Sequence, residues 1–392
     1  MAPRRKVLVI KGVANYDHLR CFVDYLRLGF AAEGAEVVEI DLARGPLSVE
    51  TFERTATWDA DLVLAINAEG AHLAGPGGRP LGGGAVPLTC WMLDEPYYQP
   101  HWDQVLRLPY VRTLWSNDET RGHAAAMGLP DPGRLDLAAR ALPRVRDEDR
   151  TIDVLFVGSI VDPDAMRSHW SAQLGTGIAA LMDALIERWA ADEHSPIRDA
   201  FRAIAEERGL ADHAGLIKVA PFVLGEVNRY VRNRRRLDLV RALRGTRMTV
   251  VGDGWGRLVD GHAFDLVPAV PFPLFEEMVS DARITLALQP IHAHGASERF
   301  FASLANGSAL VVNENRWLEE EYPAGSFAPY DRTDPESVRE RLEELRADRT
   351  RRIEMAELAL AHTLAHHTWR HRAAELLART AGTGRGMAGT AA

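Results

Sequence analysis

Side chains that can bind an anion gather in the second half of the chain, after a predicted strand at 282–290. The loop that follows this strand contains His294 and Gly295, and Glu298 and Arg299 then begin a predicted short helix. An arginine at a helix N-terminus lies beside backbone N–H groups, and both suit the oxygens of a diphosphate. The alternative is a surface arginine that pairs with Glu298.

Glycines follow other predicted strands of the same half. Gly158 and Ser159 end a strand at 152–160, and the sequence Gly252-Asp253-Gly254 ends a strand at 248–252. We expect Gly307 at the same edge of the sheet. Glycines there permit close backbone approach and supply N–H groups to an anion. A lone Gly-Asp-Gly is also a common turn, so a purely structural role stays open.

Residues 229–247 contain eight arginines and a single acidic residue, Asp238. Apolar residues recur at helical spacing in this segment, so one face should pack while the arginines lie on the other. The arginines concerned are Arg232, Arg234, Arg235 and Arg236. They are either a solvated helix face or a cationic group that steers an anion, and we expect Arg236 among the anion-binding residues.

Proton transfer requires a carboxylate or a histidine, and the first half offers two places for one. Asp17 and His18 follow the first predicted strand and begin the first predicted helix, where Asp17 is alternatively a helix N-cap. Asp94 and Glu95 follow the fourth strand, beside Pro96, where a structural turn is the alternative. We select His18, Asp94 and Asp17 as catalytic candidates.

No metal site is predicted. The pairs His362/His366 and His367/His371 have i, i+4 spacing, but no His-Glu-x-x-His arrangement accompanies them, and a packed or surface helix is the simpler interpretation. Asp162 and Asp164 in VDPDA are interpreted as a helix entry. We expect no obligatory metal and no cofactor.

Composition limits the class of protein. The chain has 392 residues, 46% hydrophobic and 26% charged, as in ordinary globular proteins. A net charge of −9 argues against a nucleic-acid binder. Cys21 and Cys90 form no pattern, and no apolar stretch is long enough to span a membrane. The basic start of the chain is interpreted as a strand entry rather than a secretory signal, so we expect a cytoplasmic protein.

Strand and helix signals alternate twice along the chain. Expected strands are 6–13, 36–42, 61–68, 87–94, 111–118, 152–160, 248–252, 282–290 and 308–313, and long helical regions are 18–34, 177–245 and 334–380. Such alternation predicts parallel sheets flanked by helices. The fold class is therefore α/β, with two doubly wound Rossmann-like domains facing a central cleft.

The expected domains are 1–145 and 151–365, joined by the charged linker RVRDEDRT. A helix at 366–380 and a disordered tail at 381–392 follow. The first strand is followed by KGVANYDH rather than Gly-x-Gly-x-x-Gly, which disfavours a dinucleotide-dependent oxidoreductase.

The order of several motifs resembles the donor-binding half of GT-B glycosyltransferases, and within them the CgeB-like, spore-maturation group. These motifs are VLFVGSI, RRRLDLVRAL, MTVVGDGW and HG…RFF.SLANG followed by ALVV. WMLDEPYY (91–98), LWSNDE (114–119), GLP (128–130) and HTWRHRAAELL (367–377) fit the same group. The likeness covers about residues 87–378.

The resemblance implies a nucleotide-sugar-dependent transferase, which would move a sugar from a nucleotide diphosphate to a hydroxyl of a small molecule, polysaccharide or protein. Together with the absence of a predicted metal site, this leads us to expect a metal-independent transfer. The donor would lie on the second domain and the acceptor on the first, with the final helix crossing back to the first. Arg299 would hold the diphosphate, and Gly252 and Gly254 would let the backbone approach the nucleotide. Many relatives have a ribose-binding glutamate where this chain has Ala302, and an acidic residue where it has His294. This departure suggests a changed donor or, alternatively, a non-catalytic binding or assembly module.

Overall fold

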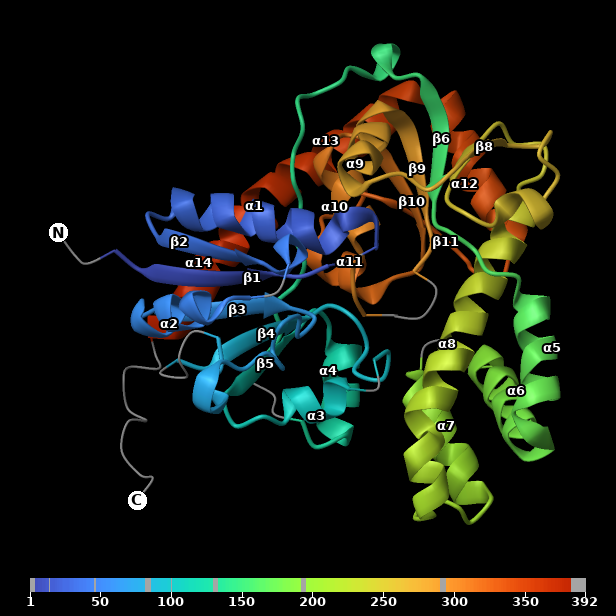
Figure 1. Cartoon of the computed structure of the whole chain (residues 1–392). Coiled ribbons are helices and arrows are strands. Elements are labelled where there is room, and N and C mark those ends of the chain that lie inside the picture. The colour runs from blue at the N-terminus through green and yellow to red at the C-terminus, as the bar shows by residue number, and fades with distance from the viewer. Residues whose placement is uncertain are drawn as a thin grey trace. The chain divides into compact units, whose positions relative to one another are not determined.

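The computed structural model describes residues 4–13, 15–45, 47–81, 86–99, 101–129, 133–191, 195–289 and 294–381 (Figure 1). Internal contacts divide the chain into two units. Unit 1 comprises Met1–Arg140, Pro271–Pro273 and Ala365–Ala392, and unit 2 comprises Ala141–Val270 and Leu274–Leu364. The tail predicted to be disordered lies outside the described residues except for Ala381, and so does Pro130 of the GLP motif.

Unit 1 is built on a five-stranded parallel sheet of order β2-β1-β3-β4-β5. The strands are β1 (Lys6–Lys11), β2 (Glu36–Asp41), β3 (Leu62–Ile66), β4 (Leu88–Met92) and β5 (Val111–Trp115). The two strands β3 and β4 are buried at every position, because helices and loops cover both faces of a parallel sheet.

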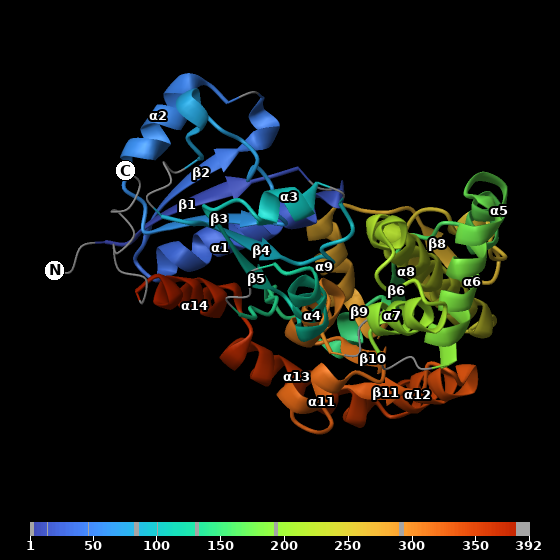
Figure 2. The ribbon, with the colours of Figure 1, turned by 90° about the horizontal axis from the view of Figure 1, so that it is seen from below.

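The helices of unit 1 are α1 (His18–Ala32), α2 (Val49–Thr57), α3 (Trp102–Leu106), α4 (Asp118–Ala126) and α14 (Trp369–Ala381). The last of them, α14, packs beside α1, at the other end of the chain (Figure 2). Trp369 makes ring contacts with Phe22, Tyr25 and Trp91, which lie on α1 and β4. The chain thus returns to the first unit through an aromatic cluster.

Unit 2 is built on a six-stranded parallel sheet of order β11-β10-β9-β6-β7-β8. The strands are β6 (Ile152–Val157), β7 (Thr249–Val251), β8 (Asp265–Val267), β9 (Ala282–Ala287), β10 (Ala309–Asn313) and β11 (Ala328–Tyr330). Successive strands run outward from β6 on one side and from β9 on the other. The strand order therefore reverses between β6 and β9, and ligands of such sheets bind beyond the carboxyl ends at this reversal.

The long helical region expected at 177–245 is in fact three helices, and a fourth precedes them. They are α5 (Pro163–Gln173), α6 (Gly175–Ala191), α7 (Ile197–Glu207) and α8 (Ala214–Ala242), which pack together in Figure 1. The end of α8 buries Leu237 and Val240 in the core of unit 2. Asp162 caps α5, since its Oδ1 accepts from the Asp164 amide at 2.9 Å. The helix entry expected in VDPDA is confirmed.

The remaining helices of unit 2 are α9 (Phe272–Asp281), α10 (Glu298–Ala305), α11 (Arg316–Glu321), α12 (Pro335–Ala347) and α13 (Arg349–His366). The region 334–380, expected to be helical almost throughout, breaks at Asp348 and again before α14. The predicted fold class, two doubly wound parallel α/β domains, is confirmed. None of the helices described has the length and apolar character that a membrane span requires.

Candidate functional site

The turn after β6 is held at three successive carbonyl oxygens by side chains from other elements. Arg299 Nε donates to Val157 O at 2.9 Å, and Trp255 Nε1 donates to Gly158 O at 2.8 Å. Arg236 completes the set, with its guanidinium donating to Ser159 O at 2.7 Å. Two guanidinium groups, one from α10 and one from α8, thus meet the same turn at the carboxyl edge of the sheet.

The glycines around this turn permit a close approach of two loops. A Cβ at Gly252, where φ is 144°, would lie 2.6 Å from the Gly158 backbone. A Cβ at Gly254, where φ is 92°, would lie 2.0 Å from Ile160 O. A side chain at Gly158 would press on the Arg236 guanidinium at 3.2 Å. These glycines are required by the packing of the protein itself, independently of any bound ligand.

Asp253 and Ser159 brace the two loops against each other. The Asp253 amide donates to Ser159 Oγ at 3.1 Å, and the Ile160 amide donates to Asp253 O at 2.8 Å. Asp253 Oδ1 also accepts from the Ala269 amide at 3.1 Å. The Gly-Asp-Gly motif therefore forms a turn that the protein itself requires, as the structural alternative predicted. This structural role is compatible with a binding role.

Arg299 lies in the first turn of α10, as the sequence predicts. Its NH1 lies 3.0 Å from Glu298 Oε1, and the side chain remains 25% exposed. The N-cap residue, Ser297, has a buried Oγ without a hydrogen-bond partner. Guanidinium groups and a helix N-terminus both favour phosphate oxygens. The predicted position at the start of the helix is confirmed, and the pair with Glu298, which was the alternative to an anion-binding role, is present as well.

His294 and Gly295 precede α10 in a loop whose first part, residues 290–293, lies outside the described residues. His294 Nε2 lies 3.4 Å from the Arg316 guanidinium, and Gly295 O accepts from Asn315 Nδ2 at 3.0 Å. Both residues are thus tied to the segment after β10. Ala302 is buried inside α10.

Gly307 lies at the wrong edge for a binding role, and the expectation for it was incorrect. It precedes β10 rather than following it, and a Cβ there would lie 2.8 Å from the Arg150 guanidinium. Arg150 itself precedes β6 and donates to Asn306 O at 2.9 Å. Parallel strands start at one edge and end at the other, so Gly307 is at the edge opposite Arg299.

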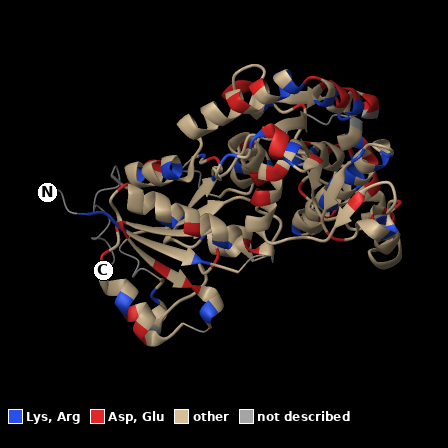
Figure 3. Ribbon diagram, turned by 90° about the horizontal axis from the view of Figure 1, so that it is seen from above, with Lys and Arg blue, Asp and Glu red and all other residues tan. Residues whose placement is uncertain are grey.

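The arginine-rich segment divides among several structural roles on α8. Arg234 pairs with Asp238 at 3.0 Å, and the Arg235 guanidinium lies over the Trp189 ring at 5.1 Å. Arg232 has partners elsewhere in the structure. Of the four arginines singled out by sequence, Arg236 is the one that reaches the turn after β6. In the ribbon of Figure 3 the positions of basic and acidic residues alternate along the described helices.

The predicted catalytic residues of unit 1 lie at the carboxyl edge of its sheet. Asp17 has a left-handed backbone, with φ of 58°, and its side chain caps no helix N–H. Asp17 thus occupies the N-cap position of α1, as the alternative had it, but without the side-chain hydrogen bond of a cap, and its carboxylate lies 3.8 Å from Arg20 Nε. His18 makes an edge-on ring contact with Phe22.

Asp94, after β4, is partly exposed and accepts from Asn67 Nδ2 at 2.7 Å. The next residue, Glu95, is instead buried against His123, with its Oε2 2.5 Å from Nδ1. The adjacent carboxylates therefore differ in access, and Asp94 is the better placed for proton transfer. We did not select Asn67 as a site residue from the sequence. The sequence feature that marks it is a polar residue directly after an apolar strand.

Glu69 is another titratable group that the sequence did not single out. It follows β3 and lies across the end of β1, so close that a Cβ at Gly12 would meet its Cγ at 2.4 Å. Burial raises the pKa of the Glu69 carboxyl. A carboxyl with a raised pKa at the end of a parallel strand is a second candidate for proton transfer.

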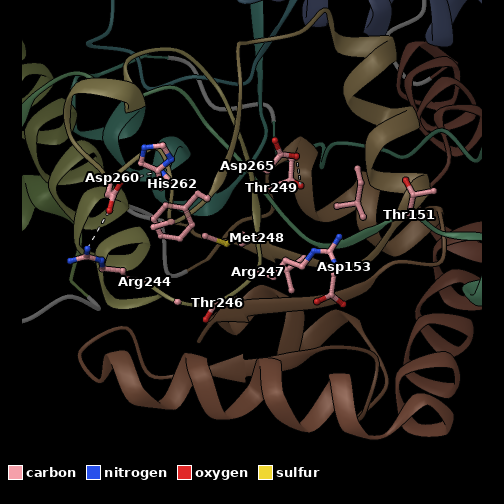
Figure 4. Close-up of a pocket in the computed structure, with 15 residues that line it drawn as sticks. Thr151, Asp153, Arg244, Thr246, Arg247, Met248, Thr249, Asp260, His262 and Asp265 are labelled. Carbon is pink, nitrogen blue, oxygen red and sulfur yellow. Dashed lines mark hydrogen bonds and ion pairs between the residues drawn. The ribbon is translucent and has the colours of Figure 1, made fainter.

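A cavity of about 880 Å³ lies in unit 2, but at the amino-terminal edge of the sheet (Figure 4). Its walls are the starts of β6, β7 and β8 and the loops before them. Arg244 pairs with Asp260 at 3.2 Å, and Thr249 Oγ1 donates to Asp265 at 3.3 Å. The cavity therefore lies at the opposite edge of the sheet from the Arg299–Arg236 turn.

The described residues contain no group of three or more potential metal ligands. The histidines near the chain end have other contacts: Arg372 donates to His367 Nδ1 at 2.8 Å, and His371 Nδ1 lies 2.7 Å from Thr368 Oγ1. Metal independence remains a prediction.

Comparisons with known proteins bear on the family and the fold. A glycosyl-transferase-like family model matches residues 232–378, less than half of the chain, and includes Arg236 and Arg299. No curated protein matches the sequence.

Three solved structures illustrate the similarity of fold. An α-glucosyltransferase with UDP-glucose and DNA containing an abasic site has a TM-score of 0.54 at 10% identity, covering 96% of this chain and 99% of that one. An α-glucosyltransferase with UDP and a 13-mer DNA has 0.53 at 10% identity, covering 97% and 100%. T4 phage BGT with UDP and Mn²⁺ has 0.52 at 12% identity, covering 96% and 98%. Unit 1 and unit 2 together thus form the two α/β domains of the GT-B fold.

Proposed function

We propose that the chain is a glycosyltransferase that moves a sugar from a nucleotide diphosphate to an acceptor hydroxyl. The observation that carries the proposal is the meeting of Arg299 and Arg236 on the turn after β6, where the strand order reverses. Two guanidinium groups beside a helix N-terminus match the charge of a diphosphate. The solved neighbours contain UDP or UDP-glucose, so a uridine donor is the first to test.

In the proposed reaction the acceptor oxygen forms a bond to the anomeric carbon while the bond from that carbon to the phosphate oxygen breaks. Negative charge then grows on the departing diphosphate, where Arg299 and Arg236 stabilise it. The acceptor hydroxyl gives its proton to a side chain of unit 1. Asp94 is the preferred base, and His18 and Asp17 are the alternatives. No metal is required in this scheme.

The finer assignments belong to the same proposal. We assign the chain to the CgeB-like group and to the cytoplasm, and we expect its acceptor to be a small molecule, a polysaccharide or a protein. These assignments rest on the motifs and composition of the sequence. Two of the neighbours were solved with DNA. The net charge of −9 supports a different acceptor here.

A non-catalytic binding module is the second candidate. Ala302 favours it, because an alanine buried in α10 cannot supply the ribose-binding carboxylate that the resemblance leads one to expect. Such a module would still bind a nucleotide but would not release a sugar from it.

A thermal-shift panel with UDP, GDP, dTDP, ADP and CDP tests the proposal. A ligand at a hundred times its Kd stabilises the fold by about 2.7 kcal/mol. We expect stabilisation by one nucleotide in the wild type and its loss in Arg299→Ala. Arg247→Ala is the matched control, since Arg247 is exposed and lies at the opposite edge of the sheet. No stabilisation by any of the five would contradict the proposal.

A further inference from the structure

Asn67 is a buried asparagine directly after β3, and its amide holds the segment after β4. Its Nδ2 donates to Asp94 Oδ2 at 2.7 Å. Its Oδ1 accepts from the backbone N–H of Leu93 at 2.7 Å and from that of Asp94 at 3.3 Å. Its own N–H donates to Trp91 O at 2.9 Å. One side chain thus fixes both the carboxylate and the main chain of Asp94.

The backbone at this position is strained. Asn67 and Ala68 are both left-handed, with φ of 50° and 56°. Asparagine tolerates this conformation better than most residues, whereas alanine rarely adopts it. Strained residues persist where the surrounding structure holds them, and they concentrate at functional sites. This left-handed conformation places the Asn67 amide between the ends of β3 and β4.

The residues on either side of Asp94 are anchored to other elements. Ser116 Oγ donates to Leu93 O at 3.2 Å, and Glu95 is buried against His123 on α4. Asp94 lies between these anchors and is partly exposed. The local structure therefore fixes the direction of a single carboxylate that solvent can reach.

We propose that Asn67 is the positioning residue for Asp94, with its amide bond to Oδ2 orienting the carboxylate that accepts the proton of the acceptor hydroxyl. This inference rests on the proposed glycosyl transfer. The hydroxyl proton moves to Asp94, the hydroxyl oxygen bonds to the anomeric carbon, and the electron pair of the broken bond leaves with the nucleoside diphosphate. A hydrogen bond donated to a carboxylate favours its ionised form, which is the form that accepts a proton.

Two glycine substitutions separate the contribution of the Asn67 amide to turnover from that of the backbone strain. Asn67→Gly removes the amide but keeps a residue that tolerates a left-handed backbone, and Ala68→Gly relieves the same strain without touching the amide. With the sugar nucleotide selected by the panel above, UDP-glucose first, we expect Asn67→Gly to lower kcat about 100-fold. The donor KM should stay unchanged, and the acidic limb of the pH profile should move to higher pH. Ala68→Gly should retain wild-type turnover.

A side-chain exchange addresses the risk that Asn67→Gly merely weakens the fold. The double variant Asn67→Asp/Asp94→Asn keeps an amide–carboxylate pair between β3 and β4 but moves the charge to the other strand end. We expect it to regain much of the melting temperature lost by the single variants and to remain inactive. A purely structural pair would regain turnover together with stability.

The outcomes separate this inference from the proposed function. If the wild type binds and turns over a sugar nucleotide while Asn67→Gly keeps its kcat and pH profile, the positioning role is overturned and the glycosyl transfer stands. Recovery of turnover in the exchanged double variant would overturn the role as well. If no nucleotide binds the wild type, both proposals fail together.

Discussion

The carboxyl edges of the two sheets use arginine in contrasting ways. In unit 1, Arg20 donates to Gly12 O, just after β1, at 2.9 Å, and its remaining donors close on both oxygens of Asp41 at 2.8 Å. In unit 2, Arg299 donates to Val157 O, at the end of β6, at the same distance. Arg236 joins it there through Ser159 O.

The difference lies in what neutralises the guanidinium. Arg20 forms a two-bond pair with a nearly buried carboxylate of the neighbouring strand, and this pair holds the pKa of Asp41 well below its usual range. The Arg299 NH1 lies 3.0 Å from Oε1 of Glu298, a partly exposed carboxylate, and Arg299 shares its turn with a second arginine. The same residue type at the end of a strand is therefore closed off by a buried carboxylate in unit 1, whereas in unit 2 it is paired with a second arginine, as the proposed anion site requires.

The largest expected effect is on turnover. Arg299→Ala should lower the rate of sugar transfer by about 10²- to 10³-fold, the range for removal of one donor to a developing negative charge. Arg299→Lys keeps the charge but not the planar fork, and should recover only part of the rate. Initial rates of nucleotide release measure both. Equal rates in the lysine variant and the wild type would show that charge alone matters.

Gly254→Ala should cost more than 1 kcal/mol of unfolding free energy, because the new Cβ would lie 2.0 Å from Ile160 O. Gly245→Ala is the matched control, since Gly245 has the same φ of 92° with nothing within 4 Å of the added carbon. Denaturant unfolding of the two variants isolates the loop contact from the backbone strain. Equal losses would refute the close approach as the reason for glycine at position 254.

Arg20→Ala should cost about 1–3 kcal/mol, since it leaves Asp41 without its charged partner. The effect depends on pH. Because the pKa of Asp41 is lowered in the fold, its stabilising contribution is present above the ordinary aspartate pKa of about 3.9 and is lost as pH falls below it. The unfolding free energies of Arg20→Ala and of the wild type should therefore differ at neutral pH and approach each other in acid. A constant difference would contradict the pairing.

Glu69→Gln should have the smallest effect. Burial raises the pKa of this carboxyl, so its unfavourable contribution is absent below the ordinary glutamate pKa, grows as pH rises from there and is complete above the folded-state pKa. The variant should be more stable at neutral pH by up to about 0.5 kcal/mol and equal to the wild type in acid. Destabilisation at neutral pH would show that the ionised carboxylate has a favourable partner.

The sequence predicted those features that depend on short-range patterns. Apolar runs located all five strands of unit 1 and β6, β7, β9 and β10 of unit 2, but the three-residue edge strands β8 and β11 were missed because so short a segment has no readable pattern. Arg299 was placed at the start of a helix because a strand, a loop and a helix start follow one another there. Gly307 was misplaced because a glycine between a helix and a strand precedes that strand, at the opposite edge. Asn67 and Glu69 were missed because their roles depend on pairing β3 with β4 and β1, which no local pattern shows. The arginines of α8 look alike in sequence, and only the packing of the helix directs Arg236 to the turn.

The most direct test is an equilibrium titration of UDP against the wild type, Arg299→Ala and Arg20→Ala. We predict that Arg299→Ala weakens binding by about ten- to a hundredfold, the loss of one charged hydrogen-bond donor, while Arg20→Ala binds as the wild type does. Unchanged affinity in Arg299→Ala, or an equal loss in Arg20→Ala, would contradict the assignment of the anion site to the turn after β6.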